Sequence, residues 1–184
     1  MTLEDEYASH PEEIRWQGHY VTAKIRGRWE YVSRARNIRA AVILAVDDDD
    51  HVILVEQFRM PLGKRCIEMP AGLIGDEPGS EGEDAATAAL RELEEETGYR
   101  AAHMESLGEY YSSPGMVTEA FTMFRAKGLT RVGEGGGTAD EGITVHRVPM
   151  DDIPAFLCAK RAEGYGIDVR MLMLLGPAAA GIAA

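Results

Sequence analysis

The segment 85–99 constrains the fold of this chain more than any other part of the sequence. It begins with a run rich in alanine and continues as Arg-Glu-Leu-Glu-Glu-Glu-Thr-Gly-Tyr. Alanine and leucine have a high helix propensity. Gly98 stands where helices commonly end on a left-handed glycine. The sequence therefore predicts a helix that ends at Gly98.

Three glutamates of this predicted helix share one face. Glu92, Glu95 and Glu96 stand at positions i, i+3 and i+4. Like charges at this spacing repel by about 0.2–0.5 kcal/mol per pair, and we expect no Lys or Arg on that face to offset them. Carboxylate oxygens without nearby His or Cys favour Mg²⁺ or Mn²⁺ over zinc. The alternative is a solvated acidic face, which is common on Glu-rich helices.

The residues around the glutamates extend the pattern to a known signature. Glu83 lies eight residues before Arg91, and Pro-Ala-Gly-Leu-Ile leads into the segment at 70–74. The pattern resembles the signature of the Nudix hydrolase family, which this chain matches in register at Glu83, Arg91, Glu92, Leu93, Glu95, Glu96, Gly98 and Tyr99. One position departs, because the signature glycine expected six residues before Glu83 is replaced by Glu77. Gly72 is the natural candidate for that glycine, so that 75–82 holds an insertion of five residues.

The resemblance implies a fold class and a metal site. The fold implied is α/β: a Nudix-type α/β/α sandwich with a mixed sheet and an N-terminal β-hairpin arm. The cofactor implied is Mg²⁺, with Mn²⁺ possible, and its ligands are Glu92, Glu95, Glu96 and the backbone carbonyl of Ala71. Glu83 supports this shell, and we expect Arg91 to pair with Glu83 and orient the helix end, away from the substrate.

A catalytic base is expected in the segment 137–143. This segment resembles the loop that carries the catalytic glutamate of ADP-ribose pyrophosphatases, which favours Glu141, with Asp140 as the alternative. Glu95 is assigned a catalytic role as well as a ligand role. The competing interpretation is an acidic loop that only keeps the protein soluble.

Three features outside the signature bear on the substrate. Pro114 and Gly115 follow Tyr99 at a distance that resembles the ADP-ribose branch of the family. Trp29 resembles the aromatic residue that this branch stacks on adenine, although a tryptophan is often buried instead. Arg59 and Glu68 are expected to pair near the pyrophosphate, because arginine supplies the forked donors that phosphate oxygens accept.

These resemblances imply hydrolysis of ADP-ribose, or a similar nucleoside diphosphate sugar, to AMP and ribose 5-phosphate. A hydrolase of GDP-mannose or another nucleotide sugar is the alternative enzyme. A non-catalytic sensor that binds ADP-ribose is the alternative from another class, although such modules usually lose signature glutamates.

Composition sets the remaining expectations. A chain of 184 residues with 45% hydrophobic content suits one compact domain. We expect an N-terminal arm over 1–35 and a Nudix domain over 36–184. The family branch commonly exchanges N-terminal strands, so the resemblance implies a homodimer. A net charge of −12 argues against nucleic acid. No apolar run reaches the length of a membrane span and no signal peptide is recognised, so we expect a cytoplasmic protein with no membrane partner.

The pattern along the chain predicts the elements outside the signature. The N-terminus is expected to be loose, followed by a strand pair over 14–33 that turns at 26–28. Aspartates 47–50 are expected to form a hairpin turn between two buried strands, which is favoured over a calcium loop. Cys66 and Cys158 are expected to be free thiols in the core. The other expected elements are strands 40–46, 51–58, 107–111, 119–127 and 142–149, a mobile glycine-rich loop 133–137, and helices 151–162 and 168–175, the last with a buried Met and Leu stripe.

Overall fold

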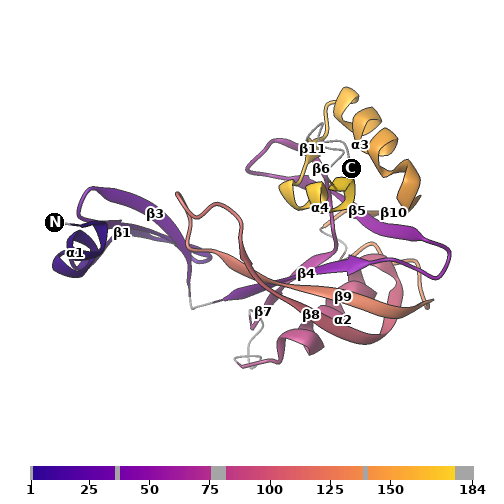
Figure 1. Ribbon diagram of the computed structural model, residues 1–184, viewed down its shortest axis with the longest axis horizontal. Coiled ribbons are helices and arrows are strands. Elements are labelled where there is room, and N and C mark those ends of the chain that lie inside the picture. The colour runs from indigo at the N-terminus through magenta and orange to yellow at the C-terminus, as the bar shows by residue number, and fades with distance from the viewer. Residues whose placement is uncertain (1, 36–37, 76–81, 139–140, 177–184) are drawn as a thin grey trace.

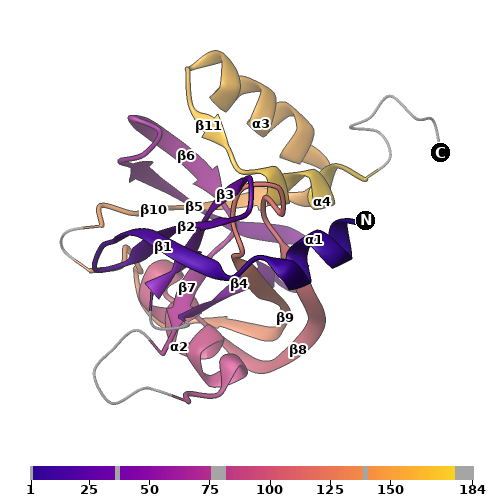
Figure 2. The same ribbon diagram turned by 90° about the vertical axis from the view of Figure 1, so that its left-hand side faces the viewer.

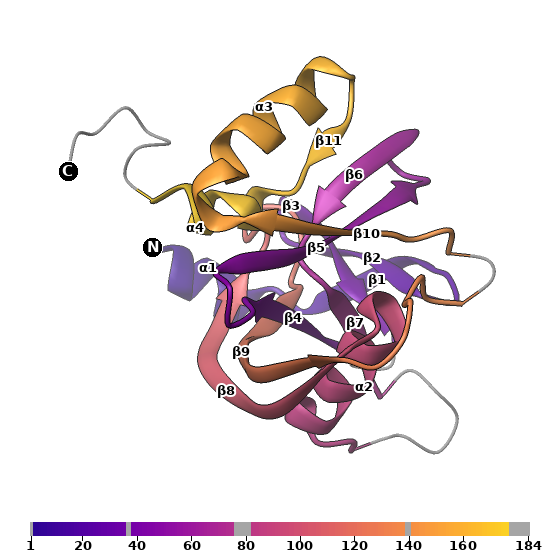
Figure 3. The same ribbon diagram turned by 90° about the vertical axis from the view of Figure 1, so that its right-hand side faces the viewer.

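The computed structural model describes residues 2–35, 38–75, 82–138 and 141–176. Two four-stranded sheets lie between helices, and a three-stranded antiparallel sheet precedes them in the chain (Figure 1). Helix α2 (Ala85–Thr97) covers one side of the sheets. Helices α3 (Ile153–Ala162) and α4 (Leu172–Leu175) cover the other side (Figure 3). This arrangement confirms the expected α/β/α sandwich with an N-terminal arm.

The arm extends away from the sandwich (Figures 1 and 2). Its sheet has the order β1 (Glu12–Gln17), β2 (Val21–Arg26), β3 (Trp29–Arg34). The β2–β3 turn at Gly27 was expected, but the structure adds a third strand, because the chain also turns at Gly18, whose N–H bonds to the carbonyl of Val21. The start is not loose, since α1 (Leu3–Ser9) begins with a capping box between Thr2 and Asp5.

The larger sheets are both mixed. One has the order β7 (Ala71–Ile74), β4 (Arg39–Ala45), β9 (Ala120–Arg131), β8 (Tyr99–Tyr111), in which β4 and β9 run parallel. The other has the order β10 (Thr144–Pro149), β5 (His51–Arg59), β6 (Lys64–Glu68), β11 (Gly166–Ile167), in which β6 and β11 run parallel.

Strand β4 explains why the core has two parts. Successive side chains of a strand point to opposite faces. Ile43 packs with Leu93 of α2, and the neighbouring Val42 packs with Ile153 and Leu157 of α3. A strand buried on both faces reads as a continuous apolar run, which is the pattern that predicted it.

The C-terminal segment differs from expectation. Instead of one helix over 168–175, a 3-10 turn η3 (Val169–Met171) leads into the short α4. Met171 is buried, but Leu172 and Met173 are about half exposed, so the expected core stripe is wrong for these two side chains. The helix expected over 151–162 is present as the 3-10 turn η2 (Met150–Asp152) followed by α3.

Two smaller expectations have mixed outcomes. Cys66 and Cys158 are both free thiols, but only Cys66 is buried, because Cys158 lies on the exposed side of α3. The 47–50 segment is a turn as expected, and Arg147 pairs with Asp47 at 2.6 Å and with Asp49 at 2.7 Å.

Within the described part of the chain, no helix is both long and apolar enough to cross a membrane.

Candidate active site

Helix α2 presents the signature glutamates on a short, well-capped element. The side chain of Asp84 accepts the N–H of Thr87 at 3.1 Å and caps the first turn. Gly98 ends the helix in the left-handed conformation, at φ 72°, as the sequence predicted. Because Leu93 and the alanines before it are buried against the sheets, the helix cannot rotate without losing core contacts.

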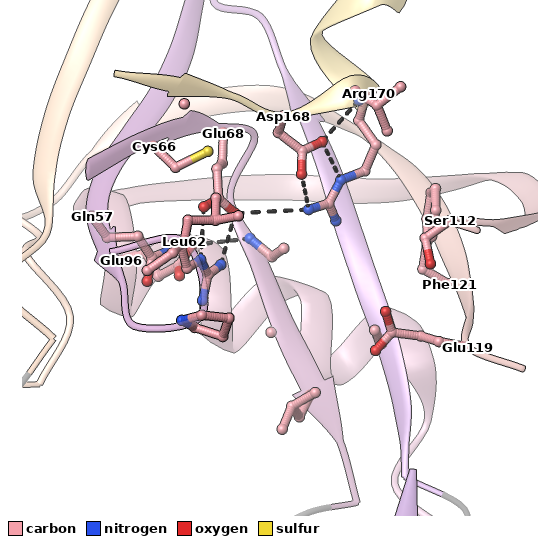
Figure 4. A pocket seen from close by; sticks show the side chains of 18 of the residues that line it. Gln57, Leu62, Cys66, Glu68, Glu96, Ser112, Glu119, Phe121, Asp168 and Arg170 are labelled. Carbon is pink, nitrogen blue, oxygen red and sulfur yellow. Dashed lines mark hydrogen bonds and ion pairs between the residues drawn. The ribbon is translucent and has the colours of Figure 1, made fainter. Parts of the chain in front are cut away.

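A cleft of about 910 Å³ lies beside this helix. Glu92 and Glu96 reach it from α2, and Ala71 and Gly72 line it from β7. Glu141 lies in its wall, as do the arginine and carboxylate side chains shown in Figure 4. Segments far apart in the sequence therefore meet at one hollow.

Glu96 is a buried carboxylate with one backbone donor. Its side chain Oε2 accepts the N–H of Ala71 at 3.0 Å, and the residue is 5% exposed. Burial, together with the negative charges of Glu92 and Glu141, raises the pKa of Glu96 to about 8, and the hydrogen bond from Ala71 opposes this shift. Three carboxylates that repel one another in a cleft form a site that a cation would stabilise.

The side chain of Glu92 lies directly against the backbone of Gly72. A Cβ atom built on Gly72 would lie 2.0 Å from Cδ of Glu92. With Glu92 in this position only glycine fits at 72, which supports Gly72 as the candidate for the signature glycine. The insertion that follows falls mostly on 76–81, outside the described residues.

Arg91 contacts more carboxylates than expected. It pairs with Glu83 at 3.6 Å, which agrees with the sequence analysis. It also pairs with Glu92 at 3.0 Å and with Glu95 at 3.2 Å. The expectation that no cation offsets the signature glutamates is therefore wrong, because the long Arg91 side chain reaches round the helix. Glu95 is half exposed and is not among the described residues that line the cleft.

The glycine-rich segment 133–137 is fastened to the end of α2. Gly136 donates its N–H to the carbonyl of Glu96 at 2.8 Å, and Gly137 donates to that of Glu95 at 3.0 Å. This differs from the expected mobile loop. Four residues beyond Gly137, Glu141 Oε2 accepts the N–H of Thr138 at 2.7 Å. Asp140, the alternative base, lies outside the described residues.

Arginine–carboxylate pairs form the other wall of the cleft. Arg59 donates through Nε and Nη2 to both oxygens of Glu68, each at 2.7 Å, which is the pairing that the sequence analysis expected. Arg170 binds Asp168 in the same two-pronged way, and Arg34 pairs with Glu119. Sequence reasoning missed these last two pairs, because no local motif marks their members.

Three predicted substrate residues, Trp29, Pro114 and Gly115, are not among the described residues that line the cleft. Trp29 is half exposed on the arm, beside Leu3 and Tyr7, and is not among the described residues that line the cleft. The turn that holds Pro114 and Gly115 is hydrogen-bonded to the arm, because Val32 donates its N–H to the carbonyl of Met116 at 3.0 Å. Nearby, Ser112 does line the cleft.

The oxygen donors of the cleft fit a hard divalent cation. Mg²⁺ keeps several waters and commonly binds through one or two carboxylates. Among the described residues, only Asp47, Asp49 and His51 form a group of three or more side-chain donors within 4.8 Å of one another, and Arg147 already pairs with both of those aspartates. Glu92 and Glu96 both line the cleft, so a hydrated ion could bind there through one or two carboxylates.

Comparison with known proteins agrees with this fold. The NUDIX domain family matches residues 36–165. The crystal structure of an ADP compounds hydrolase superposes with a TM-score of 0.66 at 22% identity, covering 93% of this chain and 92% of that one, which shows the shared fold. The chain therefore belongs to the Nudix hydrolase family, whose members typically use a divalent metal.

Curated relatives narrow the class. The ADP-ribose pyrophosphatase of Bacillus subtilis is 39% identical over 114 residues, which are 61% of this chain and 59% of that protein. A methanol dehydrogenase activator of Bacillus methanolicus is 35% identical over 127 residues, 68% of this chain and 66% of that protein. The GDP-mannose pyrophosphatase of Cronobacter sakazakii is 34% identical over 145 residues, 74% and 70% respectively. The chain thus spans less than two thirds of the length of the first two of these relatives. It belongs to the class of ADP-ribose pyrophosphatase-like Nudix proteins.

Proposed function

We propose that this protein hydrolyses the pyrophosphate bond of ADP-ribose, or of a similar nucleoside diphosphate sugar, in a reaction that requires Mg²⁺ or Mn²⁺. The observation that carries the proposal is the buried carboxylate of Glu96, which shares the cleft with Glu92, Glu141 and the arginine–carboxylate pairs of the other wall. Such a site suits a substrate that is anionic but arrives with a cation. The products are AMP and ribose 5-phosphate.

Each site residue has a stated role in this proposal. A cation held by Glu92, Glu96 and the carbonyl of Ala71, with Glu95 as a further ligand, would neutralise the diphosphate and make a bound water more acidic. Glu141 takes the proton from the attacking water, whose oxygen bonds to one phosphorus while that atom's bond to the bridging oxygen breaks. Glu141 then passes this proton to the leaving phosphate or to solvent, which balances the step and regenerates the carboxylate.

Other residues position the substrate or the ligands. The Arg59–Glu68 pair borders the diphosphate, and Glu83 holds Arg91, which in turn holds Glu92. Trp29, with Pro114 and Gly115, is assigned to the adenosine end. Trp29 lies on the arm and does not line the cleft of its own chain. A homodimer in which the arm, 1–35, contacts the partner's Nudix domain, 36–184, would bring Trp29 to the partner's cleft.

The alternatives differ in substrate or in chemistry. The similarity to a GDP-mannose pyrophosphatase favours another nucleotide sugar as the second candidate. A sensor that binds ADP-ribose without cleaving it is less favoured, since every carboxylate of the signature is present.

The excess of acidic residues opposes a nucleic-acid partner. Two free thiols fit a reducing compartment, which supports a cytoplasmic location.

A substrate panel tests the proposal. The purified chain is incubated with Mg²⁺ and with ADP-ribose, ADP-glucose, GDP-mannose or NADH, and the products are separated by anion-exchange chromatography. We expect AMP and ribose 5-phosphate in equal amounts from ADP-ribose, and no reaction after the metal is removed with EDTA. Faster turnover of GDP-mannose would transfer the assignment to that substrate. Binding of ADP-ribose without any cleavage would identify a sensor.

A further inference from the structure

Asp168 and Arg170 form a rigid pair in the wall of the cleft (Figure 4). Arg170 donates through Nε and Nη2 to the two oxygens of Asp168, each at 2.6 Å, and its backbone N–H also bonds to Asp168 at 2.8 Å. The N–H of Asp168 bonds to the carbonyl of Ile67 on β6 at 3.1 Å. Both side chains are about one-fifth exposed, so they are held firmly but still reach the cleft.

The pair lies next to the Arg59–Glu68 pair, on the side away from the signature helix. Nη2 of Arg170 is 3.7 Å from Oε2 of Glu68, which Arg59 holds from its other side. The pKa of Arg59 is raised mainly by its hydrogen bonds to Glu68 and also by the negative charge of Glu96. The cleft therefore runs from Glu96, past Glu68, to Asp168 and Arg170 (Figure 4).

The chemistry of this end of the cleft differs from that of an anion site. Arg170 and Asp168 together carry no net charge, whereas a phosphate needs an excess of cations. The guanidinium offers five N–H donors, of which Asp168 engages two, and the carboxylate oxygens accept. Donors beside acceptors match hydroxyl groups, each of which donates and accepts at once.

Phe121 fixes the plane of the guanidinium. Its ring centroid lies 5.4 Å from Cζ of Arg170, within the range of a cation–π contact. Phe121 is itself 7% exposed and stacks with Tyr110, so it is not free to move aside. Arg170 is thus held by an aromatic ring and by carboxylates, which preorganises its donors for one geometry.

We propose that Asp168 and Arg170 form the subsite that binds the hydroxyl groups of the sugar attached to the diphosphate, and so decide which sugar the protein accepts. This inference rests on the proposed function, because it assigns the far end of the same cleft. It places the diphosphate between the glutamates and Arg59, and the sugar beyond Glu68. The pair is a binding element and takes no part in proton transfer.

Two substrates separate this role from a general one. ADP-ribose carries the sugar, and the methyl ester of ADP carries the same diphosphate without it. For Arg170→Gln we expect KM for ADP-ribose to rise about tenfold, the scale of one hydrogen bond to a charged group, and KM for the methyl ester to stay within about twofold. Arg170→Lys keeps the charge but loses the fork, so we expect it not to restore KM. Equal losses on both substrates would overturn the subsite.

The matched control is Arg147→Gln, because Arg147 makes a similar two-pronged ion pair outside the cleft. It should leave KM for both substrates unchanged. A binding measurement on the unmodified protein decides the matter even if Arg170→Gln does not fold or if no substrate is cleaved. With Mg²⁺ present, ribose 5-phosphate should bind several-fold tighter than methyl phosphate in ligand-observed NMR. Equal affinities would refute the subsite, whereas absence of turnover with this preference intact would refute only the proposed hydrolysis.

Discussion

Gly72 and Glu92 are in direct contact, and the contact leaves no space for a side chain at position 72. A Cβ atom there would also lie 2.1 Å from Cγ of Glu92, so both the stem and the carboxylate of Glu92 would have to move. Gly72 belongs to β7 and Glu92 to α2, and the contact sets how closely the strand and the helix approach.

Substituting Gly72→Ala should displace Glu92 while leaving the fold intact. The end of a glutamate side chain can swing away, so we expect the melting temperature to change little. Turnover should fall at least about tenfold, because ligand geometry errors of about 1 Å are costly in catalysis. Gly133→Ala is the control, since its nearest neighbour would be 3.9 Å from the new methyl group. Unchanged turnover in Gly72→Ala would show that Glu92 is not a ligand.

Glu96→Gln should abolish turnover without unfolding the protein. A neutral amide can still accept the N–H of Ala71, and it removes a buried charge that two other carboxylates oppose. We therefore expect the metal-free variant to melt at or above the temperature of the unmodified protein. Glu94→Gln, on the same helix but paired with Arg100 at the surface, should keep full turnover. Normal rates in Glu96→Gln at saturating Mg²⁺ would remove Glu96 from the site.

Glu141→Gln should lower kcat about a hundredfold, the usual contribution of a general base, with KM and Mg²⁺ affinity nearly intact. Steady-state kinetics at several Mg²⁺ concentrations give all three quantities. Glu134→Gln is the control in the same loop, because Glu134 is exposed and pairs with Arg131. Rescue of Glu141→Gln by added metal would make Glu141 a ligand, and an inactive Asp140→Asn beside an active Glu141→Gln would assign the base to Asp140.

Trp29→Ala should raise KM for ADP-ribose more than it lowers kcat, because stacking on adenine stabilises ground state and transition state alike. Trp29 is 51% exposed, so its loss should affect the melting temperature little. Trp16→Ala removes the other tryptophan of the arm, itself 59% exposed, and should leave KM unchanged. If the partner's arm supplies Trp29, the effect should vanish at protein concentrations too low for a dimer. A lower melting temperature with unchanged KM would assign Trp29 to the packing of the arm.

Stability at acidic pH should depend on Glu56. Burial raises the pKa of this carboxyl, but hydrogen bonds from Lys160 and His146 outweigh burial and hold the pKa below its ordinary value of 4.5. A group whose folded-state pKa is depressed stabilises the fold above its unfolded pKa, and this contribution is lost as the pH falls through the folded pKa. The free energy of unfolding of the unmodified protein, measured with urea, should therefore fall steadily below about pH 4.5.

Glu56→Gln should flatten that acid dependence and cost about 3 kcal/mol at neutral pH, because it leaves the partly buried Lys160 without its carboxylate. Glu105→Gln breaks an exposed pair with Lys127 and should cost less than about 1 kcal/mol. An unchanged acid dependence in Glu56→Gln would show that other carboxyls dominate the acid transition.

The sequence was sufficient where the signal is local. The helix ending at Gly98, the two-sided burial of β4 and the turn at 47–50 all follow from spacing and propensity within one segment. The pair of Arg59 and Glu68 was also expected from the sequence, and the structure shows it.

Contacts between distant segments could not be predicted in the same way. Asp168 and Arg170 reach the cleft because β11 pairs in parallel with β6, which sets Ile167 beside Ile67. Two residues of strand carry no recognisable periodicity. The ion pairs of Arg91 with Glu92 and Glu95 were missed for another reason. The position of a residue on a helix does not determine where the end of a long side chain lies. Trp29 lies on the arm and is not among the described residues that line the cleft, so its assignment to the adenine stays a prediction.

The bonds between the glycine-rich segment and α2 couple two parts of the site that are separate in the sequence. The carbonyls of Glu95 and Glu96 accept the N–H groups of Gly137 and Gly136, so the segment leading to Glu141 starts from the same turn that carries the glutamates. A Cβ atom on Gly135 would lie 2.4 Å from the backbone of Thr97, so the two segments are in close contact at this junction. A shift of α2 would therefore carry the start of this segment with it, and one inserted residue between 133 and 137 would change the reach of Glu141 without altering any signature residue.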